Sequence, residues 1–552
     1  MMFKRPLLLF FLVAAVYLLA IPVDTMDVDA SQYASMSREM KESGSYLQVY
    51  EQGKDYLDKP PFLFWISSVS MLVLGENNFA FKFPSILFAL LALFATWRLA
   101  RLYYDKERSC LAALVLASSQ ALFLITNDIK TDTILMGWVT LALWQLARWM
   151  QTDSRLSFFT GCAAIAFGMM TKGPIALLVP VFALGSQVVL QRNWRYLWRP
   201  VYLPGLLLIA VLLLPMSIGL YQQFDLHPEK LVNGKQGVSG LRFFYWTQSF
   251  GRITGESVWN NGASFTFLLE NLLWAWLPWT LFLLVALVTA PLQLIRQGFR
   301  LHPDQEVIST GGFLITYCSL ALSKFQLPHY IYVVLPLAAI LTSGPLQQFL
   351  KGHWKKWALR TMQVAQGVVL LVLVSFPVVL LMVVFPEQRI WPWALALLAV
   401  LLPVVNFAWQ KGARGFITGS VVLMIGLNLL LSLWFYPQLL SYQVSNNAGR
   451  FIQLQNIPES RMYVFRYKRS TAALHFYSRR VVPSADSLSL LPAGCWLLTA
   501  QEGKAIIEDS GRAFTEMKSG AGFHISMLTP AFLNHRTRPQ VLENWYILRL
   551  DE

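Results

Sequence analysis

Two charged segments that follow the first apolar stretch contain the residue types needed to act on an anionic substrate. The first runs from Asp27 through Asp29 to Tyr33, and the second is the Asp-Lys-Pro-Pro turn at residues 58–61. A carboxylate can act as a general base, and a lysine ammonium can bind a phosphate group. Because both segments lie between apolar stretches, we expect a site for an anionic, membrane-borne substrate at a bilayer surface.

The first segment predicts a short amphipathic helix at residues 31–41. Apolar side chains such as Tyr33 and Met40 recur there at three- and four-residue spacing. The helix is too short and too polar to cross a bilayer, so we expect it to lie along the membrane surface. Asp29 then lies at or just before its start, where the helix dipole favours the ionised carboxylate. A simple N-cap role is the alternative, and the neighbouring Asp27 favours a functional one.

The second segment holds Lys59 on a stiff backbone. Pro60 excludes a helical conformation at Lys59, and Pro61 stiffens the turn. A rigidly held ammonium at the membrane edge suits a phosphate headgroup, and the neighbouring Asp58 could position it. A lysine that only reaches for the interface is the alternative interpretation.

Two further polar breaks separate apolar stretches. The turn at 127–132 contains Asp128, Lys130 and Asp132. Charges are costly inside a membrane, so Asp132 is either a functional acid or a solvated loop residue. The break at 171–174 contains Lys172 followed by Gly-Pro. It is either part of the same site or a helix-ending hinge whose lysine extends to the interface.

Two later segments add cations and a histidine. Arg252 ends the Gln-Ser-Phe-Gly-Arg run at 248–252 and could bind a phosphate with both arms of its guanidinium. Lys324 and His329 lie in a polar break at 323–330. His329 lacks the spacing of a metal-ligand set, so we expect an interfacial hydrogen-bonding residue and no metal site.

The composition indicates a polytopic membrane protein. Apolar residues make up 55% of the 552 residues, and the formal net charge is +15. The basic residues occur mostly in short loops between apolar stretches, which sets membrane orientation and excludes a nucleic-acid-binding protein. The four cysteines are scattered without a CxxC pair, which argues against a disulfide framework. The first apolar stretch lacks a small-x-small cleavage site, which favours an uncleaved signal anchor over a signal peptide.

Apolar stretches predict about thirteen membrane spans, because each spanning helix needs about 20 mostly apolar residues. They lie near 7–23, 80–100, 109–126, 133–150, 157–171, 174–191, 201–221, 265–292, 307–323, 330–348, 362–385, 391–409 and 415–436. With this count, the Lys- and Arg-rich loops all fall on one side, which is cytoplasmic by the positive-inside rule. The amino terminus is then inside, and the loops 24–79 and 222–264 are external together with the candidate residues.

Residues 437–552 differ in composition from the membrane domain at residues 1–436. Short β-type runs near 462–465, 496–498 and 546–548 alternate with helix-like stretches at 447–455 and 470–477. We therefore expect a small external α/β domain after the last span. Its expected role is that of a scaffold or a lid over the membrane site.

Together these motifs resemble the GT-C glycosyltransferases of the aminoarabinose-transferase and protein-O-mannosyltransferase superfamily, and bacterial lipid A aminoarabinose transferases in particular. The external Asp-Glu-x-x-Tyr-Ala loop of that family is similar to residues 29–34, and its Phe-Glu-Lys-Pro-Pro turn to residues 57–61. Its later motifs are similar to residues 131–132, 171–173, 251–253 and 323–328, in the same order. The sequence departs from the family at Ala30, Gln32 and Asp58. We therefore expect the part of the site that binds the acceptor to differ from that of the family.

The resemblance implies a GT-C fold in the bacterial inner membrane, with thirteen transmembrane helices and a small periplasmic carboxyl-terminal α/β domain. It implies transfer of a sugar from a polyprenyl-phosphate carrier, with no other cofactor, to an envelope acceptor such as lipid A. The implied roles are as follows: Asp29, Asp132 and Asp27 are catalytic, Lys59, Arg252, Lys172 and Asp58 bind the donor phosphate, and Tyr33, Lys324 and His329 contact substrate.

Two alternatives to this function stay open. The same chemistry could glycosylate a protein or a cell-wall polymer. A protein of a different class, a transporter or flippase for a lipid-linked anion, would also carry charged external loops. A transporter is expected to bury ionisable groups near the membrane midplane and to contain inverted repeats. The ionisable groups here gather on one face, and the sequence shows no repeat, so the transferase is favoured.

Overall fold

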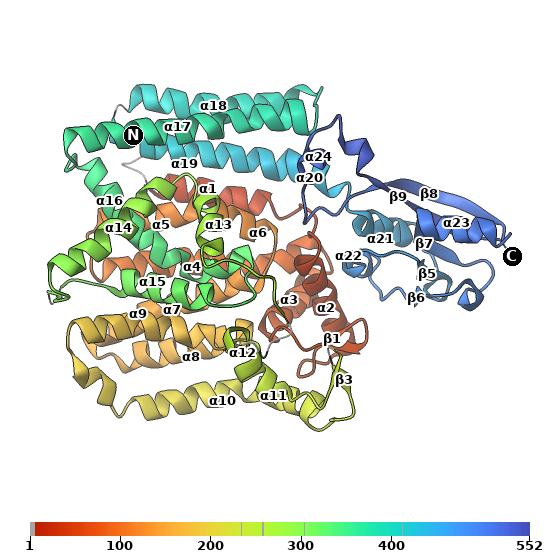
Figure 1. Ribbon diagram of the computed structural model, residues 1–552, viewed down its shortest axis with the longest axis horizontal. Coiled ribbons are helices and arrows are strands. Elements are labelled where there is room, and N and C mark those ends of the chain that lie inside the picture. The colour runs from red at the N-terminus through yellow and green to blue at the C-terminus, as the bar shows by residue number, and fades with distance from the viewer. Residues whose placement is uncertain are drawn as a thin grey trace.

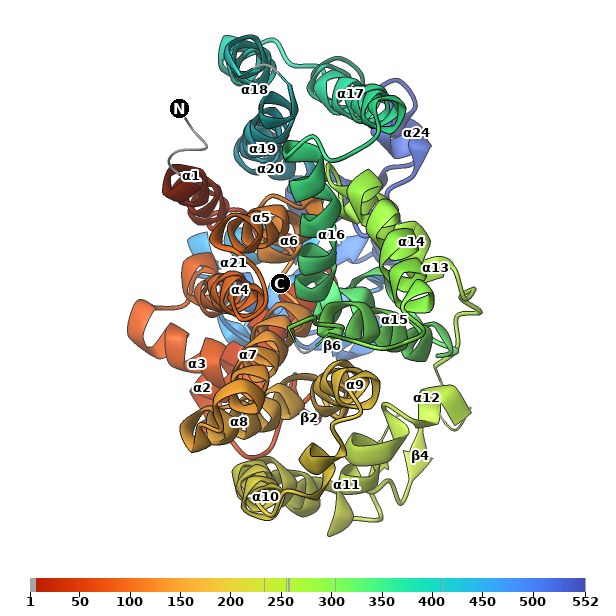
Figure 2. The ribbon, with the colours of Figure 1, turned by 90° about the vertical axis from the view of Figure 1, so that its left-hand side faces the viewer.

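The computed structural model describes residues 6–551 except 233, 255, 257, 258, 303 and 411, and the side chains of residues 6, 7, 252 and 253 lie outside the description. Most helices run side by side along the long axis of the molecule, and a small sheet domain extends from one end of them (Figure 1). Figure 2 shows these helices nearly end-on, with α10 and α18 at opposite margins. The chain is thus a multi-pass helical membrane protein with a carboxyl-terminal sheet domain.

Six helical stretches among the described residues are long and apolar enough to cross a membrane. They are α4 (Asn78–Arg101), α10 with the π-helical turn that continues it (Tyr202–Asp225), the 3-10 turn and α16 (Pro328–Leu350), α17 with its continuation (Lys356–Val384), α18 (Ile390–Trp409), and α19 with α20 (Ala413–Leu440). A seventh span results if α5 (Lys106–Ala117) and α6 (Gln120–Asn127), which meet at 48°, count as one.

The remaining predicted spans also contain helices. These are α1 (Pro6–Leu19), α7 (Thr131–Thr152), α8 (Arg155–Lys172), α9 (Ile175–Leu190), α13 (Phe267–Ala275) with α14 (Thr280–Arg296), and α15 (Ile308–Ala321). The predicted positions of the helices are therefore confirmed. Several of these helices are shorter than the length of about 20 residues that a straight, perpendicular crossing requires.

The first segment predicted to be external, residues 24–79, contains more structure than the sequence predicts. Helix α2 (Asp29–Ser43) confirms the predicted helix at 31–41, the hairpin β1 (Tyr50–Glu51) and β2 (Lys54–Asp55) follows, and the additional helix α3 (Phe62–Leu74) begins directly after the two prolines. The amphipathic pattern of residues 31–41 predicts that Arg38 lies on an exposed polar face of α2, and this is wrong, because Arg38 is 0% exposed. The reason is that α2 packs against both α3 and α22 (Ala472–Tyr477) of the sheet domain.

The second segment predicted to be external, residues 222–264, follows α10 and is mostly irregular in its described part. It contains the hairpin β3 (Leu231–Val232) and β4 (Lys235–Gln236), and the short helices α11 (Gly240–Arg242) and α12 (Gly251–Thr254). A π-helical turn, Phe243–Thr247, joins the two helices. This segment brings residues 248–250 against the end of the helical bundle.

The carboxyl-terminal domain is built on a five-stranded mixed sheet in the order β6-β5-β7-β9-β8. The strands are β5 (Met462–Phe465), β6 (Ser484–Ala485), β7 (Trp496–Ala500), β8 (Phe514–Gly522) and β9 (Glu543–Leu550). The helices α21 (Val444–Leu454), α22, α23 (Gln501–Asp509) and α24 (Pro530–Leu533) accompany it. The three predicted β-runs and both predicted helix-like stretches are confirmed.

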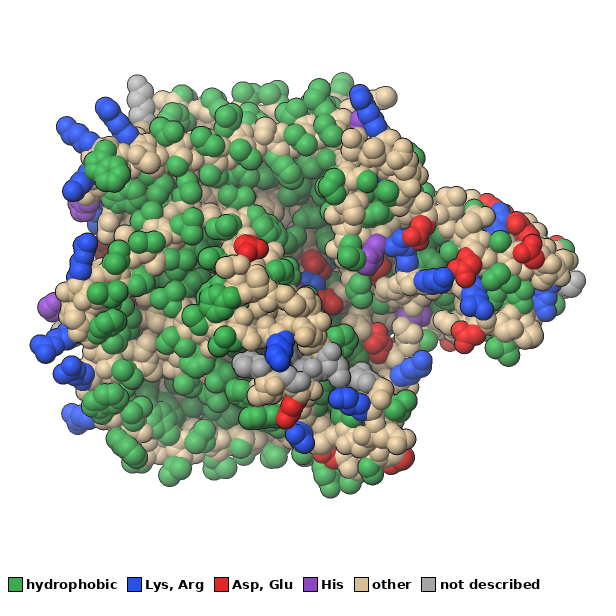
Figure 3. Space-filling model, viewed as in Figure 1, with side chains coloured by type: hydrophobic (Ala, Val, Ile, Leu, Met, Phe, Trp, Pro, Cys, Tyr) green, Lys and Arg blue, Asp and Glu red, His purple; other side chains and the backbone are tan. Residues whose placement is uncertain are grey.

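The charged side chains divide between the two ends of the helical bundle. The end that is far from the sheet domain shows mostly Lys and Arg side chains, whereas both basic and acidic side chains appear near and on that domain (Figure 3). Arg101, Arg155 and Arg195 are among the exposed basic residues of the far-end loops. This distribution agrees with the charge pattern that the loops show in the sequence.

Candidate functional site

A lysine between two carboxylates connects the first external segment to the helical bundle. Lys130 Nζ lies 2.9 Å from Asp29 Oδ2 and 3.3 Å from Asp128 Oδ2. Asp29 is in the first turn of α2, and Lys130 is the extended residue directly before α7. Two separate helix starts therefore set the position of this ion pair.

The environment keeps Asp29 ionised. Burial raises the pKa of Asp29, but the ammonium groups of Lys130, Lys59 and Lys172 outweigh it and hold the pKa below the ordinary value of 3.8. The pKa of Asp128 is raised, because burial outweighs the effect of Lys130. The pKa of Lys130 is raised as well: burial lowers it, and the two carboxylates more than offset that effect. Asp29 is thus an anionic group in contact with a stable cation.

Lys172 forms a second buried pair at the end of α8. Its Nζ donates a hydrogen bond of 2.5 Å to Asp132 Oδ1, and the Asp132 side chain is 1% exposed. Gly173 ends the helix with φ of +89°, a left-handed conformation that favours glycine, and this turn directs α8 into α9. The Lys172 ammonium also lies 4.2 Å from the centre of the Tyr330 ring, a cation–π distance.

His329 faces the other oxygen of the same acid. Its Nε2 lies 3.8 Å from Asp132 Oδ2, and that oxygen accepts no hydrogen bond from the residues that the structure describes. A buried carboxylate oxygen without a hydrogen bond is costly, so this position is suited to a proton donor from a substrate or from His329. The structure therefore brings His329 beside Asp132, another of the predicted site residues.

Lys59 is the third ammonium of the site. It lies 2.6 Å from Asp58 Oδ2, and Asp58 in turn accepts hydrogen bonds from Gln248 Nε2, at 3.1 Å to its Oδ1 and also through its backbone carbonyl. Gln248 belongs to the second external segment. The turn at 58–61 is thus fixed by its prolines and by an amide from a distant part of the chain.

A cavity of about 110 Å³ separates Lys59 from Lys172. Its polar lining consists of Lys59, Lys172, Gln248, Ser249, Ser319, Ser323 and Tyr330, and its apolar lining of Leu135, Ile175, Leu178, Phe250, Leu320 and Val333. Two ammonium groups therefore face a small space whose remaining walls are largely apolar. Such a cavity suits an anion attached to an apolar chain.

Tyr33 lies within the group of carboxylates. Its side chain is 2% exposed and packs edge-on against Phe64. Burial raises the pKa of the Tyr33 hydroxyl well above 10.0, and the charges of Asp29, Asp58 and Asp132 raise it further. Tyr33 is therefore a neutral hydroxyl beside the acids of the site.

Asp27 occupies a different environment from Asp29. Its Oδ1 accepts a 2.5 Å hydrogen bond from Ser31 Oγ, and its backbone N–H donates to Gln443 of the carboxyl-terminal region. Burial raises the pKa of Asp27 to about 6, although the Ser31 hydrogen bond lowers it. Asp27 supports the first turn of α2, whereas Asp29 contacts the lysine of the site.

Two predicted residues are not brought into the site by described contacts. The Lys324 side chain is exposed and is absent from the cavity lining, although its neighbour Ser323 is part of it. The side chain of Arg252 lies outside the described residues. Its helix α12 begins directly after Phe250, which lines the cavity.

Sequence reasoning did not assign Lys130, Gln248 and Tyr330 to the site. Lys130 had a recognisable signal, because it lies between two acids in a turn that joins apolar segments. The only sequence signal for Gln248 was that it belongs to the same short run as Arg252. Tyr330 had none, because aromatic residues at the ends of spans are common in membrane proteins.

The described residues contain no group of three or more His, Cys, Asp or Glu side chains able to hold a metal ion. Among the described residues, four carboxylates (Asp29, Asp58, Asp128 and Asp132) and three ammonium groups (Lys59, Lys130 and Lys172) form the charged part of the site, and each is in an ion pair. Lysine pairs of this kind can exchange a carboxylate partner for a phosphate oxygen. The arrangement can therefore bind an anion on the side of Lys59 and Lys172 and present an ionised carboxylate, Asp29, beside it.

Comparison with known sequences identifies similar proteins. Residues 58–218 match the family described as dolichyl-phosphate-mannose-protein mannosyltransferase. The chain is 28% identical over 328 residues to the undecaprenyl phosphate-alpha-4-amino-4-deoxy-L-arabinose arabinosyl transferase of Edwardsiella ictaluri, which is 58% of this chain and 55% of that protein. It is 27% identical over 357 residues to the protein of the same name from Erwinia tasmaniensis, 62% of this chain and 59% of that one. The matched region thus spans just over half the length of these relatives.

Solved structures of ArnT from Cupriavidus metallidurans are similar over nearly the whole chain. The apo structure gives a TM-score of 0.70 at 16% identity and covers 98% of this chain and 97% of that one. The structure bound to undecaprenyl phosphate gives a TM-score of 0.69 at 17% identity and covers 93% and 96%. The resemblance predicted from the motifs is therefore confirmed: the chain is ArnT-like, with the ArnT fold along almost its full length and a match to the mannosyltransferase family model at residues 58–218.

Proposed function

We propose that this protein transfers a sugar from a polyprenyl-phosphate carrier to an acceptor in the bacterial envelope. The observation that carries the proposal is the cavity between Lys59 and Lys172, which joins two ammonium groups to apolar walls. A polyprenyl phosphate has the matching chemistry, an anionic head on a long apolar chain. The names of the similar proteins make undecaprenyl phosphate 4-amino-4-deoxy-L-arabinose the first donor to test.

The carrier tail follows α9 and α15 away from the cavity. Ile175 and Leu178 of α9 and Leu320 of α15 line the cavity itself. Further along, the same two helices and α14 line a second, almost entirely apolar groove that includes Val181, Leu314 and Ile295. A tail that leaves the first cavity along these helices reaches the second, and burial of its methylene groups adds to the affinity.

The phosphate side of the site stabilises the leaving group. As the bond between the sugar C1 and the phosphate oxygen breaks, the electron pair stays on that oxygen. Lys59 and Lys172 are placed to stabilise the growing negative charge in a space with little water. Arg252 lies two residues after Phe250, which lines the same cavity. Asp58 holds Lys59, and Asp132 holds Lys172.

The acceptor oxygen attacks C1 as the carrier phosphate leaves. Asp29 is ionised and takes the proton of an acceptor hydroxyl, whereas for an acceptor that is itself a phosphate it orients the substrate. Asp132 and His329 assist in placing the acceptor. The Tyr33 hydroxyl, which lies near Asp29, Asp58 and Asp132, donates a hydrogen bond to it. Lys324, which is exposed, extends toward the acceptor from the rim. No group other than the lipid-linked donor is required for these steps.

The proposed topology has thirteen membrane crossings, one for each predicted segment that contains a helix. Residues 1–436 form the membrane domain and residues 437–552 the periplasmic domain. The amino terminus is cytoplasmic, because the Lys- and Arg-rich loops lie at the end of the bundle away from the sheet domain. The enzyme then works on the periplasmic face of the inner membrane, with lipid A or a related glycolipid as acceptor.

One assay tests the proposed function. Purified full-length protein is incubated with undecaprenyl-phosphate aminoarabinose and lipid A, and release of undecaprenyl phosphate is followed by mass spectrometry. Release that depends on both protein and acceptor is the expected result. Protein and cell-wall acceptors are tested in parallel, and transfer to one of them in place of lipid A would identify it as the acceptor. Absence of release with every lipid-linked donor and acceptor would contradict the proposal.

A further inference from the structure

The chain segment between α1 and α2 is held by side chains from the carboxyl-terminal region. Gln443 Nε2 donates to the carbonyl of Thr25 at 3.0 Å, and Gln443 Oε1 accepts from the N–H of Asp27 at 2.9 Å. The hydroxyl of Tyr477 accepts from the N–H of Thr25 at 2.9 Å. Two residues that are more than four hundred positions away thus fix the backbone on both sides of Met26.

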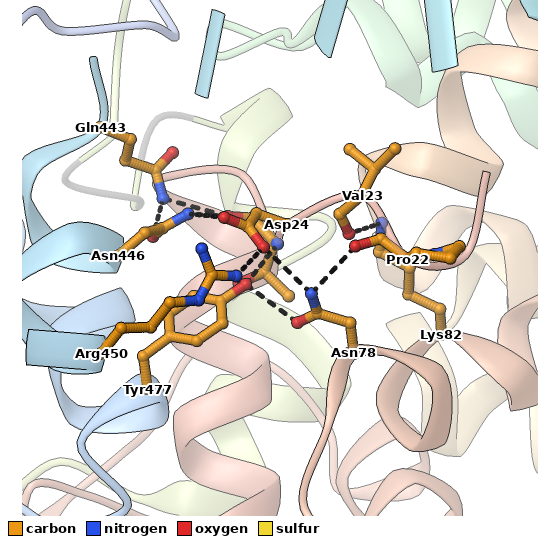
Figure 4. Close-up of polar contacts among 10 residues, drawn as sticks. Pro22, Val23, Asp24, Asn78, Lys82, Gln443, Asn446, Arg450 and Tyr477 are labelled. Atoms are coloured by element: carbon orange, nitrogen blue, oxygen red, sulfur yellow. Dashed lines mark hydrogen bonds and ion pairs between the residues drawn. The ribbon is translucent and has the colours of Figure 1, made fainter. Parts of the chain in front are cut away.

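Asp24 is the charged centre of the same contact (Figure 4). Arg450 forms an ion pair with Asp24 Oδ1, and Asn446 Nδ2 donates to its Oδ2 at 3.3 Å. Asn78, at the start of α4, donates to Asp24 at 3.1 Å and accepts from the Tyr477 hydroxyl at 2.9 Å. The network therefore joins three parts of the chain: the exit of α1, the entry of α4, and the helices α21 and α22.

The inner part of the network is buried, whereas Arg450 at its edge is exposed. Thr25 and Asn446 are 0% exposed, Gln443 is 2% exposed, and Tyr477 is 9% exposed. Buried polar groups that are fully hydrogen-bonded fix one arrangement of the chain, because any shift leaves a donor or acceptor unpaired. A displacement of this segment consequently costs several hydrogen bonds at once.

We call the contacts of Gln443, Tyr477 and Arg450 with residues 24–27 the clamp. The segment that it holds leads directly into Asp29. Asp27 accepts the hydrogen bond of Ser31 Oγ, and the Ser31 N–H donates to the carbonyl of Met26 at 3.1 Å. The first turn of α2 is therefore built on the residues that Gln443 and Tyr477 hold. Helix α2 also packs on α22, the helix that ends with Tyr477.

The sheet domain is attached to the membrane domain at two further places. Glu76 pairs with Lys41 at 2.6 Å and with Arg479 at 3.9 Å. Arg538, which is 6% exposed, bonds to the backbone of Val384 and lies 4.2 Å from the Phe385 ring centre. Attachment at separate points restricts rotation of the domain about the clamp.

We propose that the carboxyl-terminal domain is a positioning element of the site, in which Gln443, Tyr477 and Arg450 hold residues 24–27 so that the Asp29 carboxylate meets Lys130. The proposal rests on the proposed function, because it gives these residues a role in sugar transfer. They touch neither substrate nor reacting atoms. A displacement of about 1 Å in a catalytic group can lower a rate by about 10²-fold.

The test uses full-length protein with the single variants Gln443→Leu and Tyr477→Phe. Each removes an acceptor from a backbone N–H, of Asp27 and of Thr25 respectively. Hydrogen–deuterium exchange is expected to become faster in the peptide that contains residues 22–30 and to stay unchanged in the cavity helices. The kcat of transfer is expected to fall by about 10-fold or more, with KM for the donor changed by less than about 2-fold.

Two control variants separate positioning from general stability. Arg469→Gln removes the Arg469–Glu543 ion pair, which lies inside the same domain and does not include Gln443, Tyr477 or Arg450, and is expected to keep both exchange and kcat. Arg450→Lys is expected to keep most of the activity because the ammonium still pairs with Asp24, whereas Arg450→Met is expected to lose it. Thermal unfolding of each variant establishes that it is folded.

The outcomes test the positioning role separately from the proposed function. Faster exchange at residues 22–30 with a wild-type kcat would overturn the positioning role, as would unchanged exchange in both clamp variants. A loss of activity in Arg469→Gln equal to that in Gln443→Leu would also overturn it. Failure of the proposed function is detected in the wild-type protein, which would then show no transfer, whereas failure of the positioning role is detected in the variants of an active protein.

Discussion

Replacement of Asp29 by asparagine is expected to lower kcat by about 10²- to 10⁴-fold, the range by which a positioned general base accelerates a reaction. Asparagine retains the shape of the side chain and a carbonyl oxygen for Lys130, which lies 2.9 Å from Asp29 in the native protein. The change therefore removes basicity with little effect on packing. Initial rates at saturating donor and acceptor measure it, and Asp509→Asn, an exposed carboxylate on α23, is the control.

The pH profile gives a second measure of Asp29. Its pKa is lowered below 3.8, chiefly because the lysines outweigh burial, so the carboxylate is ionised at pH 5 and above. The wild-type rate is then expected to show no loss from protonation of Asp29 between pH 5 and pH 8. Lys130→Met removes the main stabilising cation, so it is expected to raise the pKa and move the acid limb of the profile to higher pH. A wild-type rate for Asp29→Asn would contradict the assignment.

Replacement of Lys172 by methionine is expected to lower kcat/KM for the donor by about 10²- to 10³-fold, the loss typical when one donor to a developing negative charge is removed. Lys172 faces the cavity from the end of α8, and its partner Asp132 is 1% exposed. The variant therefore loses a phosphate ligand and leaves a buried carboxylate without its ammonium partner. Both effects reduce binding of the anionic donor.

Two measurements separate these effects. Affinity for undecaprenyl phosphate is expected to fall in Lys172→Met, whereas affinity for undecaprenol, which lacks the phosphate, is expected to stay the same. Lys172→Arg is expected to retain part of the activity, because a guanidinium can still bind phosphate. Lys54→Met is the matched control, since Lys54 is an exposed lysine on the same external segment as Lys59. Equal affinity of wild type and Lys172→Met for undecaprenyl phosphate would contradict the phosphate site.

Much of the helical framework could be predicted from the sequence, because apolar stretches and basic loops follow from the physics of the bilayer. The same holds for β5, β7 and β9, whose short apolar runs are buried in the sheet. Strand β8 could not be predicted, because only one of its nine residues is buried and charged residues such as Glu516 and Lys518 interrupt it. Its pairing with β9 supplies the order that its own sequence lacks.

The candidate site was predictable where local sequence determines the geometry. The two prolines after Lys59 and the glycine after Lys172 place those lysines at fixed turns. Contacts between distant residues of the site could not be predicted in this way. Lys130 contacts Asp29 across a separation of 101 positions, and Gln248 contacts Asp58 across 190. No local pattern encodes a contact between such distant residues.

The burial of α2 illustrates the same limit. Its spacing of apolar and polar residues predicts one exposed face, yet Ser35, Ser37 and Arg38 are buried. Helix α22, which packs on α2 together with α3, belongs to the domain at the other end of the chain. Ala30, at which the first-segment motif departs from the family that it resembles, is also 0% exposed. A different acceptor contact is expected to use the surface near Gln32, which bonds to Glu51 at 2.8 Å.

The most direct test of the central claim is a structure of this protein determined with undecaprenyl phosphate. We predict that the phosphate lies between Lys59 and Lys172, within about 4 Å of both Nζ atoms, a distance at which charges interact strongly in a dry cavity. The first isoprene units are expected between α9 and α15. A phosphate bound at the basic loops on the opposite end of the bundle, with the cavity between the two lysines filled by something else, would contradict the account.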